Sequence, residues 1–73
     1  MKIKIFGAEG YAGLSGIEFP AVVEASSTVW CGERYMAVSE KELARIGAEA
    51  YQPDETYTPS AYNCLYFQNY EVL

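Results

Sequence analysis

The side chains of this sequence that could perform acid–base or covalent chemistry are carboxylates and cysteines, because the chain contains no histidine. Without histidine, a serine or cysteine nucleophile lacks its usual base. Glu40 and Glu42 suit the positive end of a helix dipole instead. Asp54 and Glu55 are adjacent in a polar segment, whereas glycosidase-type chemistry needs two carboxylates across a cleft. We therefore expect no enzyme activity and no catalytic residue.

Metal binding has equally little support in the sequence. The two cysteines, Cys31 and Cys64, have no histidine with which to complete a zinc site. Asp54, Glu55 and Glu49 lack the spacing of an EF-hand calcium loop. In a reducing cytosol both cysteines are expected to be free thiols. The sequence predicts neither a metal ion nor another cofactor.

Tyrosines are the most conspicuous side chains that remain. The chain has seven, and five of them follow residue 50. Tyrosine combines a large apolar ring with a hydroxyl and is enriched at protein interfaces. One interpretation is that these rings pack in a small sheet and cover its edge; the other is an acidic, aromatic protein-binding face. The residues predicted to form this face are Tyr51, Asp54, Glu55, Tyr57, Tyr62, Tyr70 and Glu71.

The charge distribution restricts the partners that such a face could bind. The net charge is −5, and the segment from Ile46 to Leu73 contains no basic residue. Direct binding to nucleic acid requires a basic patch, and acidic membrane surfaces attract basic segments. We therefore expect no direct nucleic-acid contact and no membrane binding. The expected partner is a protein with a basic surface.

The segment GAEGYAGLSG, residues 7–16, follows a predicted strand over Lys2–Phe6. The stretch MKIKIFGAEGYAG resembles the N-terminal GxxGxxG of N-acetyl-glutamyl-phosphate reductases, with matching positions Gly7, Gly10 and Gly13. That resemblance implies a Rossmann-type turn and a helix whose N-terminus holds the phosphate of NADP.

The resemblance covers residues 1–13 and ends there, because the following segment alternates with the two-residue period of a strand. The favoured interpretation of the glycines is therefore a mobile loop between two strands. A binding loop that exposes Tyr11 and Leu14 is the alternative, and a nucleotide-binding fragment is the least favoured hypothesis.

Three further strands are predicted by alternation and turn residues. The first covers residues 17–26, with an apolar face formed by Ile17, Phe19, Ala21, Val23 and Ala25. Two extended pieces then flank a turn at residues 32–33, and the first of them is either a separate strand or a continuation of the preceding strand past a kink at Ser26 and Ser27. The core candidates in these pieces are Trp30, Tyr35, Met36 and Val38.

One helix is signalled clearly. Ser39 and Glu42 form a capping box, in which the serine accepts from the Glu42 N–H and the Glu42 carboxylate returns to the Ser39 N–H. Val38 and Leu43 occupy the positions of a hydrophobic staple. We expect a helix of about three turns that begins near Glu40 and ends by Tyr51, since Pro53 follows. Gly47 either ends it earlier or is tolerated within it at a cost of about 1 kcal/mol.

A long loop over residues 52–63 and a closing strand over residues 64–73 complete the chain. In that strand Tyr66, Tyr70 and Val72 are expected on one face, and the other carries Leu65, Phe67 and Leu73. The expected fold class is α+β: residues 1–73 form a small single domain, with one α-helix packed on one face of a three- to four-stranded, mostly antiparallel sheet. The element order is β-β-(β)-α-β.

These features predict a small acidic non-enzymatic protein-binding module. In size and acidity it resembles the inhibitors that phages and mobile elements encode against host proteins, including anti-CRISPR and other anti-defence proteins. That resemblance implies occlusion of a basic surface of a host protein. No apolar run reaches the about 20 residues that a membrane span needs, and no signal peptide is recognisable. We therefore expect a cytoplasmic protein, in the host cytoplasm if it is phage-encoded.

Self-assembly is the alternative function. The predicted closing strand has apolar side chains on both faces, which would suit a structural or accessory subunit that pairs this strand with a copy of itself in a homodimer.

Overall fold

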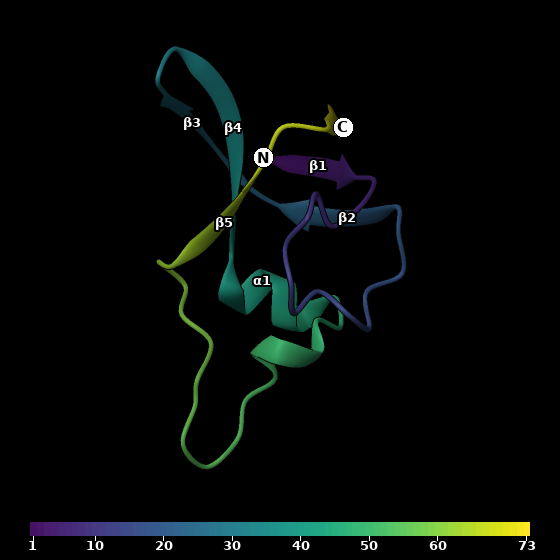
Figure 1. Ribbon diagram of the computed structural model, residues 1–73, viewed down its shortest axis with the longest axis vertical. Coiled ribbons are helices and arrows are strands. Elements are labelled where there is room, and N and C mark those ends of the chain that lie inside the picture. The colour runs from purple at the N-terminus through teal and green to yellow at the C-terminus, as the bar shows by residue number, and fades with distance from the viewer.

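Two small antiparallel sheets and one short helix make up the structure, a computed structural model that describes residues Met1 to Leu73 (Figure 1). The predicted α+β class is confirmed. The six strands form two sheets of three, with the orders β2-β1-β6 and β3-β4-β5, where the sequence suggested a single sheet. In chain order the elements are β1 (Lys2–Ile5), β2 (Ala21–Glu24), β3 (Ser26–Trp30), β4 (Glu33–Ser39), α1 (Glu40–Arg45), the 3-10 turn η1 (Glu49–Tyr51), β5 (Cys64–Phe67) and β6 (Tyr70–Val72).

The division into two sheets occurs between β2 and β3. The Ala25 N–H donates to the Met1 carbonyl at 2.8 Å, and the Ala25 carbonyl accepts from the Met1 amino group at 2.8 Å. The next residue, Ser26, lies opposite Ala37 of β4 instead. Because successive residues of a strand direct their N–H and C=O groups to opposite sides, this one segment has β1 on one side and β4 on the other.

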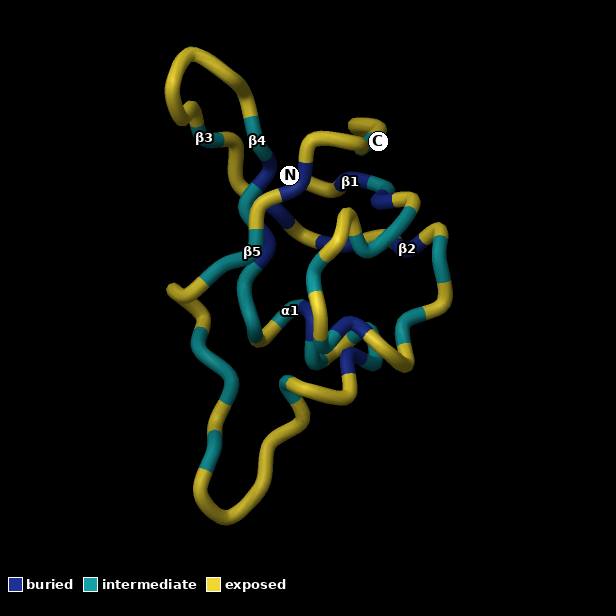
Figure 2. Tube along the Cα trace, in the orientation of Figure 1, coloured by how far each residue is buried: buried dark blue, intermediate teal, exposed yellow.

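The core lies between the two sheets and the helix (Figure 2). The first sheet contributes Ile3, Ile5 and Val23, each fully buried. The second sheet and α1 contribute the remaining large side chains that are almost completely buried: Met36, Val38, Phe67 and Leu43. The predicted core roles of Met36 and Val38 are therefore confirmed. Burial of such apolar side chains from both sheets is the main force that holds the sheets together.

Helix α1 begins at the predicted cap. The Ser39 hydroxyl accepts from the Glu42 N–H at 3.1 Å. The reciprocal half of the capping box is wrong, because the Glu42 carboxylate binds the N–H of Glu24 in β2 and the guanidinium of Arg45. The acid that was expected to close the helix terminus thus connects the helix to a strand.

The helix is shorter than predicted because Gly47 ends it. Gly47 has a φ of 108°, and its N–H donates to the Ala44 carbonyl while the Ala48 N–H donates to Leu43. This is the Schellman arrangement, in which glycine accepts the left-handed conformation without strain. Gly16 packs directly against this terminus, and a Cβ on Gly16 would lie 2.4 Å from the Gly47 carbonyl oxygen.

The strand predicted over residues 17–26 begins only at Ala21. Pro20, which follows a cis peptide bond, has no N–H to donate to a sheet. Ile17 and Phe19 lie outside any strand and still pack partly buried against the core. The apolar alternation was therefore right about burial and wrong about the start of the strand.

Two other sequence predictions are corrected by the sheets. Trp30 is 71% exposed rather than in the core, because it lies at the end of the outer strand β3. The single closing strand is broken into β5 and β6, which belong to different sheets. The Glu9 carboxylate binds the N–H groups of Gln68 and Asn69 at 3.0 and 3.2 Å, so the chain turns at this point.

Replacing the helix cap, Ser39→Ala, is expected to lower the free energy of unfolding by about 1 kcal/mol, because the Glu42 N–H loses its acceptor. Urea denaturation measures the change. Ser15→Ala is the matched control, since the Ser15 hydroxyl makes no hydrogen bond, and it should stay within about 0.5 kcal/mol of the wild type. Equal losses in both variants would contradict the capping role.

Candidate functional site

An aromatic hollow of about 490 Å³ is the candidate site, and it lies on the β3-β4-β5 sheet. Its lining residues are Tyr11, Thr28, Val29, Trp30, Tyr35 and Tyr66. Trp30 is 71% exposed and Tyr66 48%. Contiguous exposed side chains of this kind are characteristic of interaction sites, whereas single exposed apolar residues are common everywhere.

Strand register explains why these side chains meet. Thr28 of β3 lies opposite Tyr35 of β4, and Tyr66 of β5 lies opposite Ala37 two residues further along. Side chains alternate between the faces of a sheet, so all four share one face. Met36 and Phe67 point the other way and enter the core. The sheet therefore has a buried inner face and an aromatic outer face.

Tyr11 forms the wall of the aromatic hollow on the β5 side. Its hydroxyl donates to the Tyr66 carbonyl at 3.0 Å and accepts from the Tyr66 N–H at 3.2 Å. Its ring packs at an angle on Phe67, with 5.8 Å between ring centroids. The Tyr11 side chain thus anchors the glycine-rich segment, provides hydrogen-bond partners for the outward backbone groups of Tyr66 in β5, and lines the hollow.

The glycine-rich segment is anchored along its length. Glu9 binds the chain between β5 and β6, and the Ser15 carbonyl accepts from the Glu49 N–H at 2.8 Å. Leu14 is only 4% exposed, so its expected exposure in a binding loop is wrong, whereas Tyr11, the other residue named for that loop, lines the hollow. No helix follows Gly13, and the phosphate-binding helix implied by the reductase resemblance is therefore missing.

Glu33 supplies negative charge beside the aromatic hollow. Its Oε2 accepts from the Tyr35 hydroxyl at 3.3 Å and from the Gln68 side-chain amide at 2.9 Å. Desolvation, followed by the nearby Glu33 carboxylate, raises the pKa of Tyr35. The Tyr35 hydroxyl consequently remains a neutral donor at physiological pH. The site combines exposed rings with an acceptor suited to a basic side chain.

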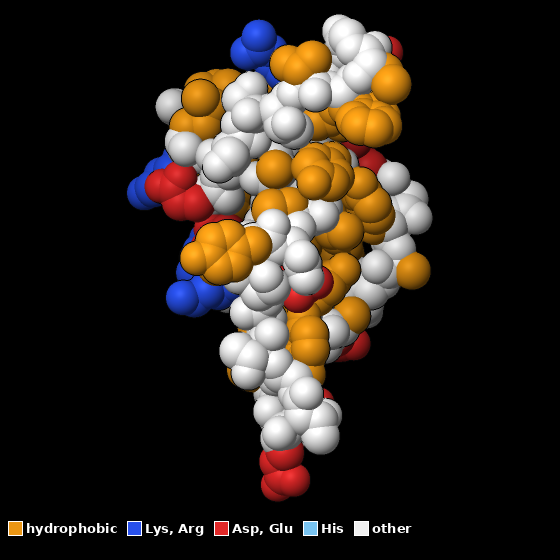
Figure 3. Space-filling view, turned by 90° about the vertical axis from the view of Figure 1, so that its left-hand side faces the viewer, with side chains coloured by type: hydrophobic (Ala, Val, Ile, Leu, Met, Phe, Trp, Pro, Cys, Tyr) orange, Lys and Arg blue, Asp and Glu red, His pale blue; other side chains and the backbone are white.

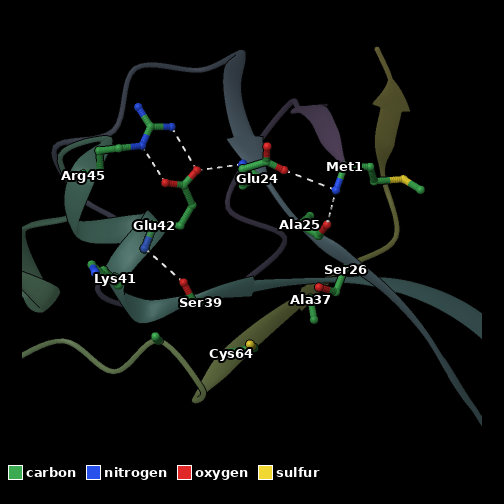
Figure 4. Close-up of a pocket in the computed structure, with 11 residues that line it drawn as sticks. Met1, Glu24, Ala25, Ser26, Ala37, Ser39, Lys41, Glu42, Arg45 and Cys64 are labelled. Atoms are coloured by element: carbon green, nitrogen blue, oxygen red, sulfur yellow. Dashed lines mark hydrogen bonds and ion pairs between the residues drawn. The ribbon is translucent and has the colours of Figure 1, made fainter.

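A second hollow, of about 470 Å³, continues along the same sheet toward α1 (Figure 4). Small side chains from the outer face of the sheet line it, namely Ser26, Ala37, Ser39 and Cys64, and Lys41 stands at its helical side. Burial raises the pKa of the Cys64 thiol, which makes it a poor nucleophile. Both cysteines are free, and no group of metal-ligating side chains is present.

Figure 4 also shows how α1 closes the edge of β2. In Figure 4 the Glu42 carboxylate accepts from the Glu24 N–H, at 2.6 Å. Outside that view, the Arg45 guanidinium donates to the Val22 carbonyl at 3.2 Å. The same two side chains form an ion pair. Hydrogen bonds from Arg45 lower the pKa of Glu42, so this carboxylate stays ionised. Glu42 and Arg45 therefore provide the acceptor and the donor that a neighbouring strand would offer to the outer edge of β2.

The long loop over residues 52–63 is tied to the first turn of α1. The Glu40 carboxylate accepts from the Tyr57 hydroxyl at 2.7 Å and from the Ser60 N–H at 3.1 Å. Asp54 accepts from the Thr56 N–H at 2.8 Å and stabilises the tip of the loop. Figure 3 shows acidic side chains at the lower extremity of the molecule and hydrophobic side chains above them.

The predicted site residues fall into two separate groups. Five of them lie in η1 or in the long loop: Tyr51, Asp54, Glu55, Tyr57 and Tyr62. Tyr70 and Glu71 lie in β6, near the opposite end of a molecule 39 Å long (Figure 1). Tyr51 and Tyr70 pack partly against the core, whereas Tyr62 is 92% exposed. The structure does not bring the two groups into one face.

Apart from Tyr11, the residues of the aromatic hollow were not predicted from the sequence as a binding site. Trp30 and Tyr35 were assigned to the core, and Tyr66 was considered only as part of a closing strand. The two-residue alternation over residues 28–37 contained a usable signal, because it places Thr28, Trp30, Tyr35 and Ala37 on one face of a hairpin. Which face is buried depends on the other sheet, and no local pattern specifies that.

No protein-family model, curated protein or solved structure matches this chain. None of its helices has the length and apolar character required to cross a membrane.

Tyr11→Phe is expected to destabilise the fold by about 1–2 kcal/mol, because the Tyr66 N–H and C=O lose their shared partner while the ring stays on Phe67. Amide exchange at Tyr66 should accelerate accordingly. Tyr62→Phe is the matched control, since Tyr62 is exposed and its hydroxyl makes no hydrogen bond. Unchanged Tyr66 exchange in Tyr11→Phe would refute the edge-capping role.

Alkaline pH is expected to release the long loop. Desolvation and the hydrogen bond to Glu40 raise the pKa of Tyr57 from 10.0 to about 12. Since the folded pKa is the higher one, this contribution to stability is complete below pH 10.0 and is lost as the pH rises toward about 12. Ultraviolet titration of the wild type minus Tyr57→Phe isolates this residue. A midpoint at the ordinary tyrosine pKa would contradict the contact.

Proposed function

We propose that this protein is a small acidic non-enzymatic protein-binding module that docks its aromatic hollow on a basic surface of another protein. The observation that carries this proposal is the exposure of Trp30 beside Tyr35 and Tyr66 on one sheet face. Tryptophan and tyrosine contribute most strongly to binding when a partner covers them. Fixed aromatic side chains also lose little conformational entropy on binding.

Charge supports a basic partner. Glu33 lies at the aromatic hollow, the loop tip carries Asp54 and Glu55, and the net charge is −5. Opposite charges accelerate encounter and orient the two proteins, whereas the desolvated aromatic contacts supply affinity. The aromatic contacts are needed because only 10 of the 73 residues are acidic.

The mechanism consistent with these features is occlusion. A protein of this size covers a basic surface sterically and electrostatically, and no reaction is required. Inhibitors of the anti-CRISPR and anti-defence type, which phages and mobile elements encode, work on host proteins in this manner. The corresponding compartment is the cytoplasm, that of the host if the protein is phage-encoded.

Affinity capture from lysate of the source or host cell, followed by mass spectrometry, tests the proposal. One stoichiometric partner with a basic surface should bind the wild type and be released at high salt. Tyr35→Ala should weaken binding by about tenfold or more, because it removes a central ring of the hollow. Tyr62→Ala is the control, since it removes an exposed ring elsewhere.

The double variant Asp54→Lys/Glu55→Lys separates the aromatic hollow from the long loop. Both residues are exposed at the loop tip, so the fold should be retained. A large loss of binding in this variant with none in Tyr35→Ala would move the binding face to the loop. A partner that binds all variants equally would contradict both surfaces.

A further inference from the structure

The Glu33 carboxylate beside the aromatic hollow has no positively charged partner within the chain. Both of its hydrogen bonds, from the Tyr35 hydroxyl and the Gln68 side-chain amide, reach Oε2, and Oε1 accepts none. The ion pairs of the structure involve two other acids, Glu24 and Glu42. Because the donors on Oε2 are neutral groups, the negative charge of Glu33 stays uncompensated.

The hairpin turn between β3 and β4 places Trp30 directly across from this carboxylate. Cys31 and Gly32 have φ values of 50° and 79°, and a positive φ at both positions is characteristic of a two-residue type I′ turn. The turn fixes the register, in which Trp30 lies opposite Glu33. Directly opposite side chains have Cβ atoms about 4.5–5.5 Å apart. The one indole ring of the chain and an unpaired carboxylate are therefore neighbours.

The rings around the aromatic hollow leave their faces unused. Tyr11 and Phe67 are the one pair of rings in contact. Trp30 and Tyr35 are diagonal neighbours across β3 and β4, and side chains so related stand about 7–8 Å apart. This distance is twice the contact separation of about 3.5–4.0 Å between stacked carbon atoms. There is thus room for one flat group between these two rings.

A cation is the occupant that this combination favours. The face of an aromatic ring carries partial negative charge and attracts cations, with tryptophan the strongest of the three rings. The Glu33 carboxylate adds a full negative charge at the same place, and the whole chain carries −5. A neutral apolar group would remove water from that carboxylate and give it no partner in return.

No basic side chain of this protein fills the hollow. Its lining contains neither lysine nor arginine, and no basic group lies within ion-pairing distance of Glu33. Arg34 is the next residue in the sequence, but side chains alternate along β4, so Arg34 lies on the other face of the sheet. The cation therefore has to come from another molecule.

We propose that the aromatic hollow binds an arginine side chain of a basic protein, an inference that rests on the proposed function and specifies the group that its partner presents. The guanidinium stacks flat between Trp30 and Tyr35 and donates to Oε1 of Glu33. Arginine is favoured over lysine because its guanidinium is planar and weakly hydrated, and because it stacks on a ring while it donates N–H bonds from its edge.

Polar acceptors in the hollow distinguish a guanidinium from a quaternary ammonium group. Thr28 lies opposite Tyr35 on the floor of the hollow, and its hydroxyl makes no hydrogen bond within the chain. Together with Oε1 of Glu33 it offers two acceptors to an arriving donor. A quaternary ammonium group has no N–H and would leave both oxygens unpaired.

The hollow is accessible to a protruding arginine. Trp30 is 71% exposed and Tyr66 48%. Tryptophan, tyrosine and arginine are also the side chains that most often dominate binding energy at protein interfaces. The seated arginine is therefore the expected centre of the proposed interface.

Titration of the purified chain with short peptides at low salt tests the inference. Trp30 is the only tryptophan, so its indole N–H gives a single isolated signal in a proton–nitrogen NMR spectrum. The peptide acetyl-Gly-Arg-Gly-amide should shift this signal and that of the Glu33 amide in a saturable manner. The matching citrulline peptide, which has the same shape and no charge, should bind about tenfold more weakly or worse.

The variant Glu33→Gln removes the charge and keeps an acceptor for Tyr35 and Gln68, so it should fold and bind the arginine peptide about tenfold more weakly. Glu18→Gln is the matched control, because Glu18 is exposed, lies outside the hollow and makes no hydrogen bond or ion pair. It changes the net charge equally and should bind the peptide as the wild type does.

Three results would overturn the inference: no saturable shift with the arginine peptide, equal weakening by Glu33→Gln and Glu18→Gln, or binding of the corresponding lysine or trimethyllysine peptide as tight as that of arginine. Capture of a partner from lysate does not depend on these titrations. A wild type that retains its partner but does not bind the arginine peptide therefore refutes the arginine inference and leaves the proposed function in place.

Discussion

Unpaired backbone groups at sheet edges are the constraint on which this structure depends. Six short strands in two sheets leave four outer edges, and the chain is too short to cover them with further strands. Two edges are completed by side chains that imitate a strand: the Tyr11 hydroxyl on β5 and the Glu42–Arg45 pair on β2. Each of these sets of hydrogen bonds joins residues far apart in the sequence. The contacts that satisfy the sheet edges therefore also hold distant parts of the small fold together.

The surface proposed to bind a partner is held in place by the same contacts. Tyr11 holds the glycine-rich segment on the core through Phe67 while it lines the aromatic hollow. Glu33 restrains Tyr35 and Gln68 on the other side of the site. Side chains that are held before a partner arrives lose less entropy when it binds. Tyr11 and Tyr35 are therefore held by contacts within the chain itself.

The sequence allowed correct predictions of those features that depend on residues close together in the chain. The Ser39 cap and the alternation of Ile3 and Ile5 were identifiable because capping and burial patterns span only a few residues. The exposure of Trp30 and the break in the strand after Phe67 were not identifiable, because both depend on residues far away in the sequence. The other sheet buries the opposite face of the β3-β4 hairpin, and the Glu9 carboxylate binds the chain where it turns at Gln68. The tyrosine-rich second half was rightly singled out as aromatic, but its rings are divided between the loop and the two sheets.

The edge caps, by which we mean the hydrogen bonds from the Tyr11 and Glu42 side chains to the sheet edges, are made to main-chain atoms, and this has a consequence for sequence variation. Tyr11 binds the main chain of Tyr66, and Glu42 binds the main chain of Glu24, so neither cap depends on the side chain it faces. Any residue except proline at positions 66 and 24 preserves these bonds. The side chains at these two positions can therefore change while the hydrogen bonds that hold the framework stay intact.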